Sequence, residues 1–154
     1  MPPLSAVIFD MNDVLCRYDR AARVLSIAKA SHRAPAAIEA AIWGSGYEDL
    51  ADTGAMDADE YLRGFGERIG YALTLQEWIA AMRGALSPLP RALRLAVEIG
   101  RKARIAVLTN NNYLVAREID VLFPELRQAF GEFFFVSAEF RARKPDPEVY
   151  RRCV

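Results

Sequence analysis

Three short apolar runs, separated by stretches with helical patterns, constrain the fold of this 154-residue chain more than any other feature. The runs are SAVIF at 5–9, RIAVLT at 104–109 and EFFFVS at 132–137. Each is apolar along its length instead of alternating, which is typical of strands in a parallel sheet covered on both faces. Strands that alternate with helices favour right-handed parallel crossovers. The sequence therefore predicts a doubly wound α/β domain.

Helix start signals place helices between and after these runs. Residues 90–100 carry apolar side chains at helical spacing, and Pro90 suits the first turn. The asparagines at 110–112 suit an N-cap before a second apolar stripe. A third helix is expected to start with Asp146 as its cap and Pro147 at its first position.

The interval 16–86 does not follow this alternation, because we find no strand pattern in it. It contains helix signals instead: Asp57 and Glu60 have the spacing of a capping box, and so do Thr74 and Glu77. Its large aromatic residues, of which we expect the tryptophans to lie in the core, are Trp43, Tyr47, Tyr61, Phe65 and Trp78. The pattern predicts a helical module inserted after the first strand.

The charge balance argues against a nucleic-acid or membrane partner. Twenty basic side chains offset twenty acidic ones, so no net field draws the chain to a charged polymer or surface. The amino terminus MPPLS lacks the basic and apolar regions of a signal peptide, and no apolar run has the length of a membrane span. We therefore expect a cytoplasmic protein with neither kind of partner.

Histidine and cysteine are too sparse for several common catalytic sites. His32 is the only histidine, which argues against a histidine-based zinc site and, unless His32 itself serves, against a Ser/His/Asp triad. Cys16 and Cys153 lie far apart, with no metal-type spacing. We expect two reduced thiols, and a surface or helix-end position for His32.

Polar side chains with useful chemistry follow each predicted strand. Asp10 comes directly after the first run, and Thr109 and Asn110 end the second. Lys144 lies in the loop after the third run. Ligands of an open parallel sheet bind outside the carboxyl ends of its strands, so we expect these residues to be neighbours. A carboxylate nucleophile, a hydroxyl and an ammonium on one rim suit a phosphoryl group, although Asp10 alone also fits a cation site or a polar turn.

The segments FDMNDVL, VLTNN and SAEFRARKPDPEVY resemble, in this order, the first three motifs of the haloacid dehalogenase (HAD) superfamily, and the resemblance covers almost the whole chain. It implies a Rossmann-like α/β core at 1–15 and 87–154 with a parallel sheet, and an inserted helical cap of the C1 type at 16–86. Within the superfamily, the layout is most similar to bacterial sugar-phosphate phosphatases such as the α-D-glucose-1-phosphate phosphatases.

The resemblance also implies roles for single residues. Asp10 matches the nucleophile that forms an aspartyl phosphate, and Thr109, Asn110 and Lys144 match positions that bind the phosphoryl group. Mg²⁺ would be held by the carboxylate of Asp10 and the backbone carbonyl of Asn12. The implied function is a Mg²⁺-dependent phosphatase of a small phosphorylated metabolite.

Two departures from the family pattern predict impaired activity. Where the phosphatases place an aspartate that transfers protons, this chain has Asn12, through natural or engineered substitution, and loss of acid–base catalysis typically costs about 10²–10⁴-fold. We expect Asp13, one residue away, to point elsewhere. The family's fourth motif, an acidic pair after a fourth strand, is absent from these 154 residues.

We therefore expect a core that is incomplete at its C-terminus, through truncation or because another subunit covers the first strand. The open edge of that strand favours self-association. A catalytically disabled relative that acts as a binding or interaction module is the alternative function. Arg141 and Arg143, in the loop before Lys144, are expected to be solvated.

Overall fold

A three-stranded parallel sheet lies at the centre of the fold in the computed structural model, which describes residues 5–153. The strands β1 (Ala6–Phe9), β4 (Arg104–Thr109) and β5 (Phe134–Val136) lie in the order β1-β4-β5. Phe9 is opposite Val107 in the register, so the carboxyl ends of the strands meet at one edge. The three predicted strands and the α/β class are confirmed. The amino-terminal MPPL, with our expectation about a signal peptide, lies outside the described residues.

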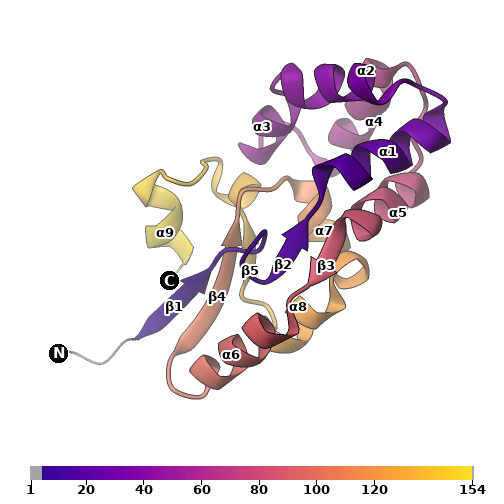
Figure 1. Cartoon of the computed structure of the whole chain (residues 1–154). Helices are drawn as coiled ribbons and strands as arrows, with labels where there is room; N and C mark the ends of the chain where they lie inside the picture. The colour runs from indigo at the N-terminus through magenta and orange to yellow at the C-terminus, as the bar shows by residue number, and fades with distance from the viewer. Residues whose placement is uncertain (1–4, 154) are drawn as a thin grey trace.

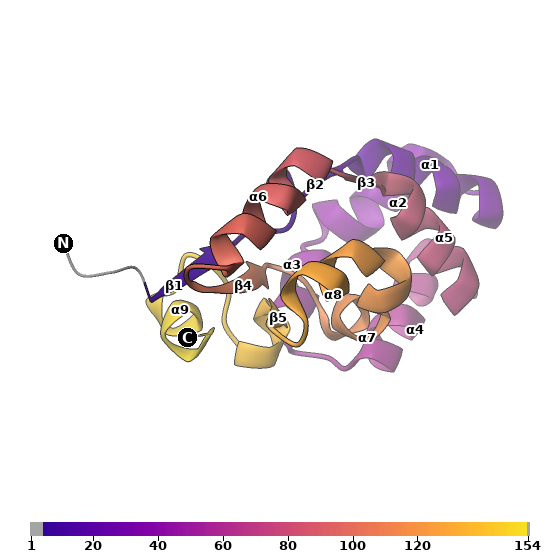
Figure 2. The ribbon, with the colours of Figure 1, turned by 90° about the horizontal axis from the view of Figure 1, so that it is seen from below.

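Helices cover both faces of this sheet, which explains why its strands are apolar along their length. Val107 packs into the larger core cluster, whereas Ala106 and Leu108 belong to a second cluster with α9. Figure 2 shows α6 and α9 on opposite sides of β1 and β4. The helices around the sheet are α6 (Pro90–Gly100), α7 (Tyr113–Leu122), α8 (Pro124–Phe130) and α9 (Pro147–Cys153).

The remaining helices gather beyond the carboxyl ends of the strands, where Figure 1 shows them as one group. They are α1 (Arg20–Ser31), α2 (Pro35–Glu39), the π-helical turn η1 (Ala40–Gly44), α3 (Tyr47–Asp52), α4 (Ala58–Ile69) and α5 (Leu75–Ala85). Both expected capping boxes are present, at the starts of α4 and α5. The predicted helical character of this interval is therefore confirmed, while its boundaries as a cap domain stay a prediction.

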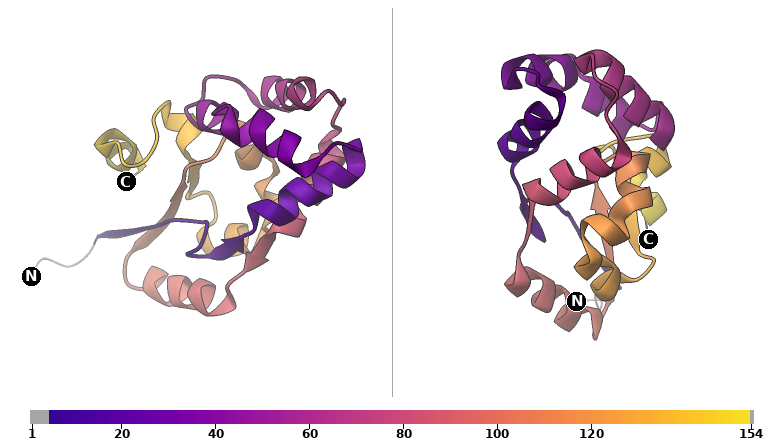
Figure 3. Two further views of the ribbon diagram at one scale, coloured as in Figure 1. Left: turned by 45° about the horizontal axis from the view of Figure 1, so that its top comes forward. Right: turned by 90° about the vertical axis from the view of Figure 1, so that its right-hand side faces the viewer.

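The expectation of no strand in this interval is wrong. β2 (Cys16–Tyr18) pairs antiparallel with β3 (Leu86–Pro88), and Figure 3 shows the chain leaving the sheet through β2 and returning through β3. Each strand has three residues, and Arg17 and Pro88 interrupt any apolar run. Segments this short show no period-2 pattern, so only the folded structure reveals them.

The core of the helical module is built around a buried charge. Arg23 is 4% exposed, and its Nη2 lies 2.9 Å from Glu48 Oε1 and donates at 2.9 Å to the Tyr61 hydroxyl. Burial lowers the pKa of Arg23, but Glu48 and the neighbouring tyrosines raise it well above its usual value. Trp78 is fully buried and Trp43 packs against the core, as expected. Because the guanidinium is paired, its burial is tolerated.

The expected surface or helix-end position of His32 is confirmed. Cys16 and Cys153 are free thiols, both buried. His32 is exposed and ends α1 in a left-handed conformation. Within residues 5–153, no helix has the length and apolar character needed to cross a membrane.

The end of α3 packs tightly against the 3₁₀ helix η2 (Ser137–Phe140), which follows β5. Ser137 is buried, and its hydroxyl donates to the carbonyl oxygen of Asp52 at 2.7 Å. Gly54 lies two residues after Asp52 and has φ of 74°. A Cβ on Gly54 would collide with the carbonyl oxygen of Ala138. A side chain at this position is therefore disfavoured by the backbone conformation and, more strongly, by lack of space.

Gly54→Ala is expected to destabilise the fold by about 2–5 kcal/mol, because left-handed strain and a backbone collision add. Urea denaturation measures the change. Gly46→Ala is the matched control, since Gly46 has φ of 76° but no atom within 4 Å of the place that an added methyl group would occupy. Gly46→Ala should cost only the conformational strain, about 1–2 kcal/mol. Equal losses in the two variants would show that the contact with Ala138 is not tight.

The carboxyl group of Asp52 is buried at the same place. Its side chain is 8% exposed, and Oδ1 has no hydrogen-bond partner among the described residues. Burial, followed by the charge of Glu48, raises the pKa of Asp52 from 3.8 to about 7; Asp49 adds to the rise, and Arg143 and Arg23 oppose it. Between these two values the folded chain keeps a proton that the unfolded chain has lost. Stability therefore falls as the pH rises through this window.

Asp52→Asn should remove this pH dependence, because an amide stays neutral. The free energy of unfolding of the variant minus that of the parent should grow from about pH 4 to about pH 7, by at most on the order of 4 kcal/mol, and then level off. Urea denaturation at several pH values measures the difference, in which all other titrations cancel. A difference that does not change with pH would contradict a raised pKa for Asp52.

Candidate functional site

Asp10 and Lys144, which are far apart in the sequence, are in contact at the carboxyl edge of the sheet. Lys144 Nζ lies 2.7 Å from Asp10 Oδ2 and donates to the carbonyl oxygen of Leu108 at 2.9 Å. The other carboxylate oxygen of Asp10 accepts from the backbone N–H of Met11 at 2.8 Å. The Asp10 side chain is 42% exposed, whereas that of Lys144 is 17% exposed. A solvent-accessible carboxylate thus faces an ammonium that the fold holds in place.

Thr109 lies at the end of β4, between these two loops. Its side chain is buried, with 1% exposed, and Oγ1 accepts a hydrogen bond from Asn111 Nδ2 at 2.8 Å. The backbone N–H of Asn111 donates in turn to Ser137 Oγ at 3.1 Å. The hydroxyl of Thr109 is therefore oriented by a side chain that the sequence did not single out for this role.

Asn110 joins the β4 loop to the loop that carries Lys144. Its Oδ1 accepts from the backbone N–H of Lys144 at 2.8 Å, and its Nδ2 donates to the carbonyl oxygen of Lys144 at 3.2 Å. The amide therefore fixes the backbone of Lys144, and a phosphate contact from Asn110 stays a prediction. Asn112 has the expected role of N-cap, since its Oδ1 accepts from the first turn of α7.

The turn after β1 sets the directions of Asn12 and Asp13. Asp13 has φ of 60°, and its exposed carboxylate accepts from the backbone N–H of Tyr18 at 3.5 Å. The thiol of Cys16 lies 3.8 Å from Asn12 Oδ1. Burial, then the charges of Asp13 and Asp10, raises the pKa of Cys16 to about 12, so the thiol keeps its proton. Asn12 thus has a neutral neighbour, and nothing in these contacts supplies a proton donor of suitable pKa.

The oxygen ligands at this site suit a hard cation. The carboxylate of Asp10 and the backbone carbonyl of Asn12 are of the kind that Mg²⁺ prefers, and Mg²⁺ commonly completes its shell with waters and phosphate oxygens. Residues 5–153 contain no group of three or more His, Cys, Asp or Glu side chains that would bind a metal unaided. The oxygen atoms of Asp10 and Asn12 are thus of a kind compatible with magnesium, and the binding of magnesium by these two residues stays a prediction.

Arg143 is the residue for which the sequence expectation is wrong. It is not freely solvated: Nη2 lies 2.9 Å from Asp49 Oδ1, and Nε is buried without a partner among the described residues. Asp49 belongs to α3, so the partner comes from the helical module, almost a hundred positions away in the sequence. Local sequence gives no signal for such a pair, because the fold alone brings α3 and the loop before α9 together.

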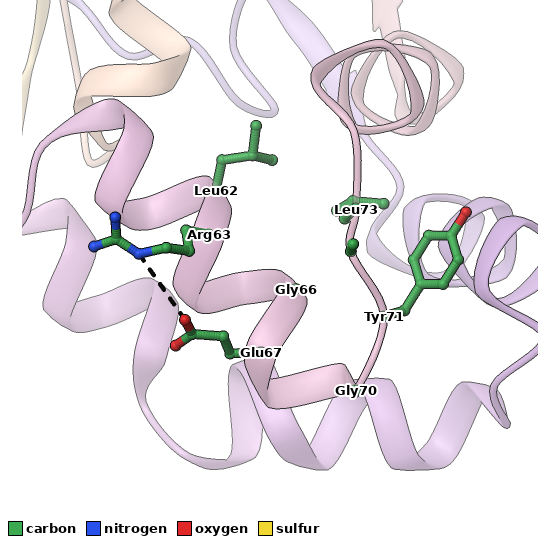
Figure 4. A pocket seen from close by; sticks show the side chains of 8 residues that line it. Leu62, Arg63, Gly66, Glu67, Gly70, Tyr71 and Leu73 are labelled. Carbon is green, nitrogen blue, oxygen red and sulfur yellow. Dashed lines mark ion pairs between the residues drawn. The ribbon is translucent and has the colours of Figure 1, made fainter.

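Two hollows in the protein surface are large enough for a small ligand. Figure 4 shows a pocket of about 350 Å³ between α4 and the segment 70–73, where Arg63 lies 3.9 Å from Glu67. None of the proposed site residues lines this pocket. A second, more polar hollow of about 650 Å³ adjoins the turn after β1 and is lined by Asp13, Arg17, Tyr18, Asp19, Arg20 and Leu89.

Solved structures with the same fold belong to HAD enzymes. A HAD family enzyme of Bacteroides thetaiotaomicron, in its magnesium complex, is 21% identical with a TM-score of 0.76, and the match covers 99% of this chain and 76% of that one. A predicted HAD-like hydrolase of Porphyromonas gingivalis is 19% identical with a TM-score of 0.72, and the match covers 97% of this chain and 74% of that one. L-2-haloacid dehalogenase of Xanthobacter autotrophicus is 16% identical with a TM-score of 0.59, and the match covers 97% of this chain and 63% of that one.

These identities are low, so the likeness to solved structures concerns the fold. A search among curated proteins gave no match. The family model of haloacid dehalogenase-like hydrolases, in contrast, matches residues 4–154, which include Asp10, Thr109 and Lys144. On this match and on the shared α/β architecture, the chain belongs to the haloacid dehalogenase-like hydrolases.

Proposed function

We propose that the chain is a Mg²⁺-dependent phosphatase of a small phosphorylated metabolite, which acts through an aspartyl phosphate on Asp10. The observation that carries the proposal is the 2.7 Å contact between Lys144 Nζ and Asp10 Oδ2. A carboxylate and a phosphate repel each other, and an ammonium beside both offsets that repulsion where charge accumulates. The half-exposed carboxylate leaves room for the phosphate to approach.

The first step is attack of an Asp10 carboxylate oxygen on phosphorus. The new bond from this oxygen to phosphorus forms as the bond to the leaving oxygen breaks, and the pair of electrons leaves with that oxygen. Lys144 and Thr109 offset the negative charge on the phosphoryl oxygens, and Asn111 keeps the Thr109 hydroxyl oriented. Magnesium, bound through Asp10 and the carbonyl of Asn12, would supply further positive charge against the phosphate.

Asn12 is the weak point of this mechanism. An alkoxide leaving group needs a proton, and the water that opens the aspartyl phosphate must lose one, yet an amide does neither at neutral pH. General acid–base catalysis contributes about 10²–10⁴-fold, so we infer a slow enzyme in which the geometry for attack is kept. The magnesium and inorganic phosphate complex of the B. thetaiotaomicron enzyme supports the chemistry by analogy of fold.

The substrate is proposed to be a sugar phosphate or a metabolite of similar size. The polar hollow beside Asp13, with Arg17 and Tyr18 in its wall, adjoins the turn that carries Asn12, although none of the proposed site residues lines it. The helical module at 16–86 would act as a cap that closes over the rim and excludes water. We further propose a cytoplasmic location, no nucleic-acid or membrane partner, and self-association through the β1 edge as the route to any oligomer.

A second candidate is a disabled relative that binds a phosphorylated ligand without turnover. Asn12 is the observation that favours it, because the binding residues remain while the proton-transfer group is missing. Two measurements together separate the phosphatase from the binding module: calorimetric titration with inorganic phosphate and Mg²⁺, and an assay of phosphate release. Binding without turnover, even after the acid is restored, favours the binding module.

Asn12→Asp should raise phosphate release from an alkyl phosphate with Mg²⁺ by about 10²–10⁴-fold over the parent chain, because it restores the proton-transfer group. Colorimetric phosphate detection measures the rates, with chelator-treated samples as the metal control. All variants are made in the protein that the complete reading frame encodes. Asp10→Ala should abolish release in both backgrounds. Failure of Asn12→Asp to release phosphate would overturn the phosphatase assignment.

A further inference from the structure

The loop that carries Lys144 is fixed on two sides. On the sheet side, the amide of Asn110 makes two hydrogen bonds with the backbone of Lys144. On the other side, the preceding residue, Arg143, forms an ion pair with Asp49 of α3 at 2.9 Å. The position of the ammonium relative to Asp10 therefore depends on a helix that contributes no group to the proposed phosphate site.

The same helix also reaches the loop after β4. The carbonyl oxygen of Asp52 accepts from Ser137 Oγ at 2.7 Å, and Ser137 Oγ accepts from the backbone N–H of Asn111 at 3.1 Å. Asn111 in turn holds the hydroxyl of Thr109. Two residues of the proposed phosphate site are thus connected to α3 by separate chains of contacts, one through Asp49 and one through Asp52.

Arg143 and Asp52 hold complementary unused groups at this place. Nε of Arg143 is a buried donor without a partner, and Oδ1 of Asp52 is a buried acceptor without one, among the residues that the structure describes. The charged groups that face Asp52 are Glu48 and Asp49 of α3, Arg143 of the loop before α9, and Arg23 of α1. An exposed ion pair contributes little, and Asp49 is 69% exposed, but the Arg143 side chain is only 32% exposed and its Nε is buried, so the guanidinium is the more constrained partner.

We propose that Arg143 is a positioning residue for Lys144, and that Asp49 holds it through their ion pair. The inference rests on the proposed function for its consequences in catalysis, since Lys144 acts on the phosphoryl group. Arg143 itself need not touch the substrate.

The test compares Arg143→Met, Arg143→Lys and Asp49→Asn in the Asn12→Asp background. Arg143→Met and Asp49→Asn should lower kcat about 10- to 100-fold with KM within about twofold, since a misplaced catalytic group costs on this scale. Arg143→Lys, which keeps the charge, should recover part of the loss. The controls are Asp59→Asn, which breaks the 2.8 Å ion pair between Asp59 of α4 and Arg117 of α7, and Arg151→Met at a largely exposed site.

A readout that needs no activity keeps the inference separate from the proposed function. Hydrogen exchange at the backbone amides of 141–144 and 146 should be faster in Arg143→Met and Asp49→Asn than in the parent, and unchanged in both controls. If no variant releases phosphate, the proposed function fails and the exchange rates alone decide the positioning role. The positioning role of Arg143 is overturned if both test variants match the controls in kcat and in hydrogen exchange at 141–144 and 146.

Discussion

The ion pair between Asp10 and Lys144 is the contact on which the rest of the site depends. It joins two loops separated by more than a hundred residues, and it exists because parallel strands end at the same edge of a sheet. Lys144 is in turn held by the carbonyl of Leu108 and by Asn110, both at the end of the central strand. The sheet therefore does more than bury apolar side chains: it sets the distance between the proposed nucleophile, Asp10, and the ammonium of Lys144.

Much of this arrangement could be predicted from the sequence, because its causes are local. Apolar runs without alternation indicated strands covered on both faces, and the division of Ala106, Val107 and Leu108 between two core clusters shows why. Side-chain caps such as Asp57 and Thr74 marked helix starts correctly. The strands β2 and β3 were missed because three residues give no periodicity. The roles of Asn111 and Arg143 were missed because their partners are defined only by the tertiary fold.

Asn12 separates two requirements that usually occur together in a phosphatase. In the proposed mechanism, Asp10, Thr109 and Lys144 would serve attack and charge compensation, whereas the position of the proton-transfer group holds an amide beside a thiol that keeps its proton. Attack on a phosphate with a good leaving group needs no general acid, but hydrolysis of the aspartyl phosphate needs a base. The covalent intermediate should therefore form faster than it is hydrolysed.

The most direct test of this account is peptide mass spectrometry of the chain after incubation with Mg²⁺ and an activated aryl or acyl phosphate, followed by borohydride trapping of any acyl phosphate. The account predicts a trapped product at Asp10 that accumulates to a large share of the protein and is absent from Asp10→Asn. It also predicts a smaller share in Asn12→Asp, where the intermediate is hydrolysed. A chain that acquires no modification at Asp10, or acquires it at another carboxylate, would contradict the assignment of Asp10 as the nucleophile.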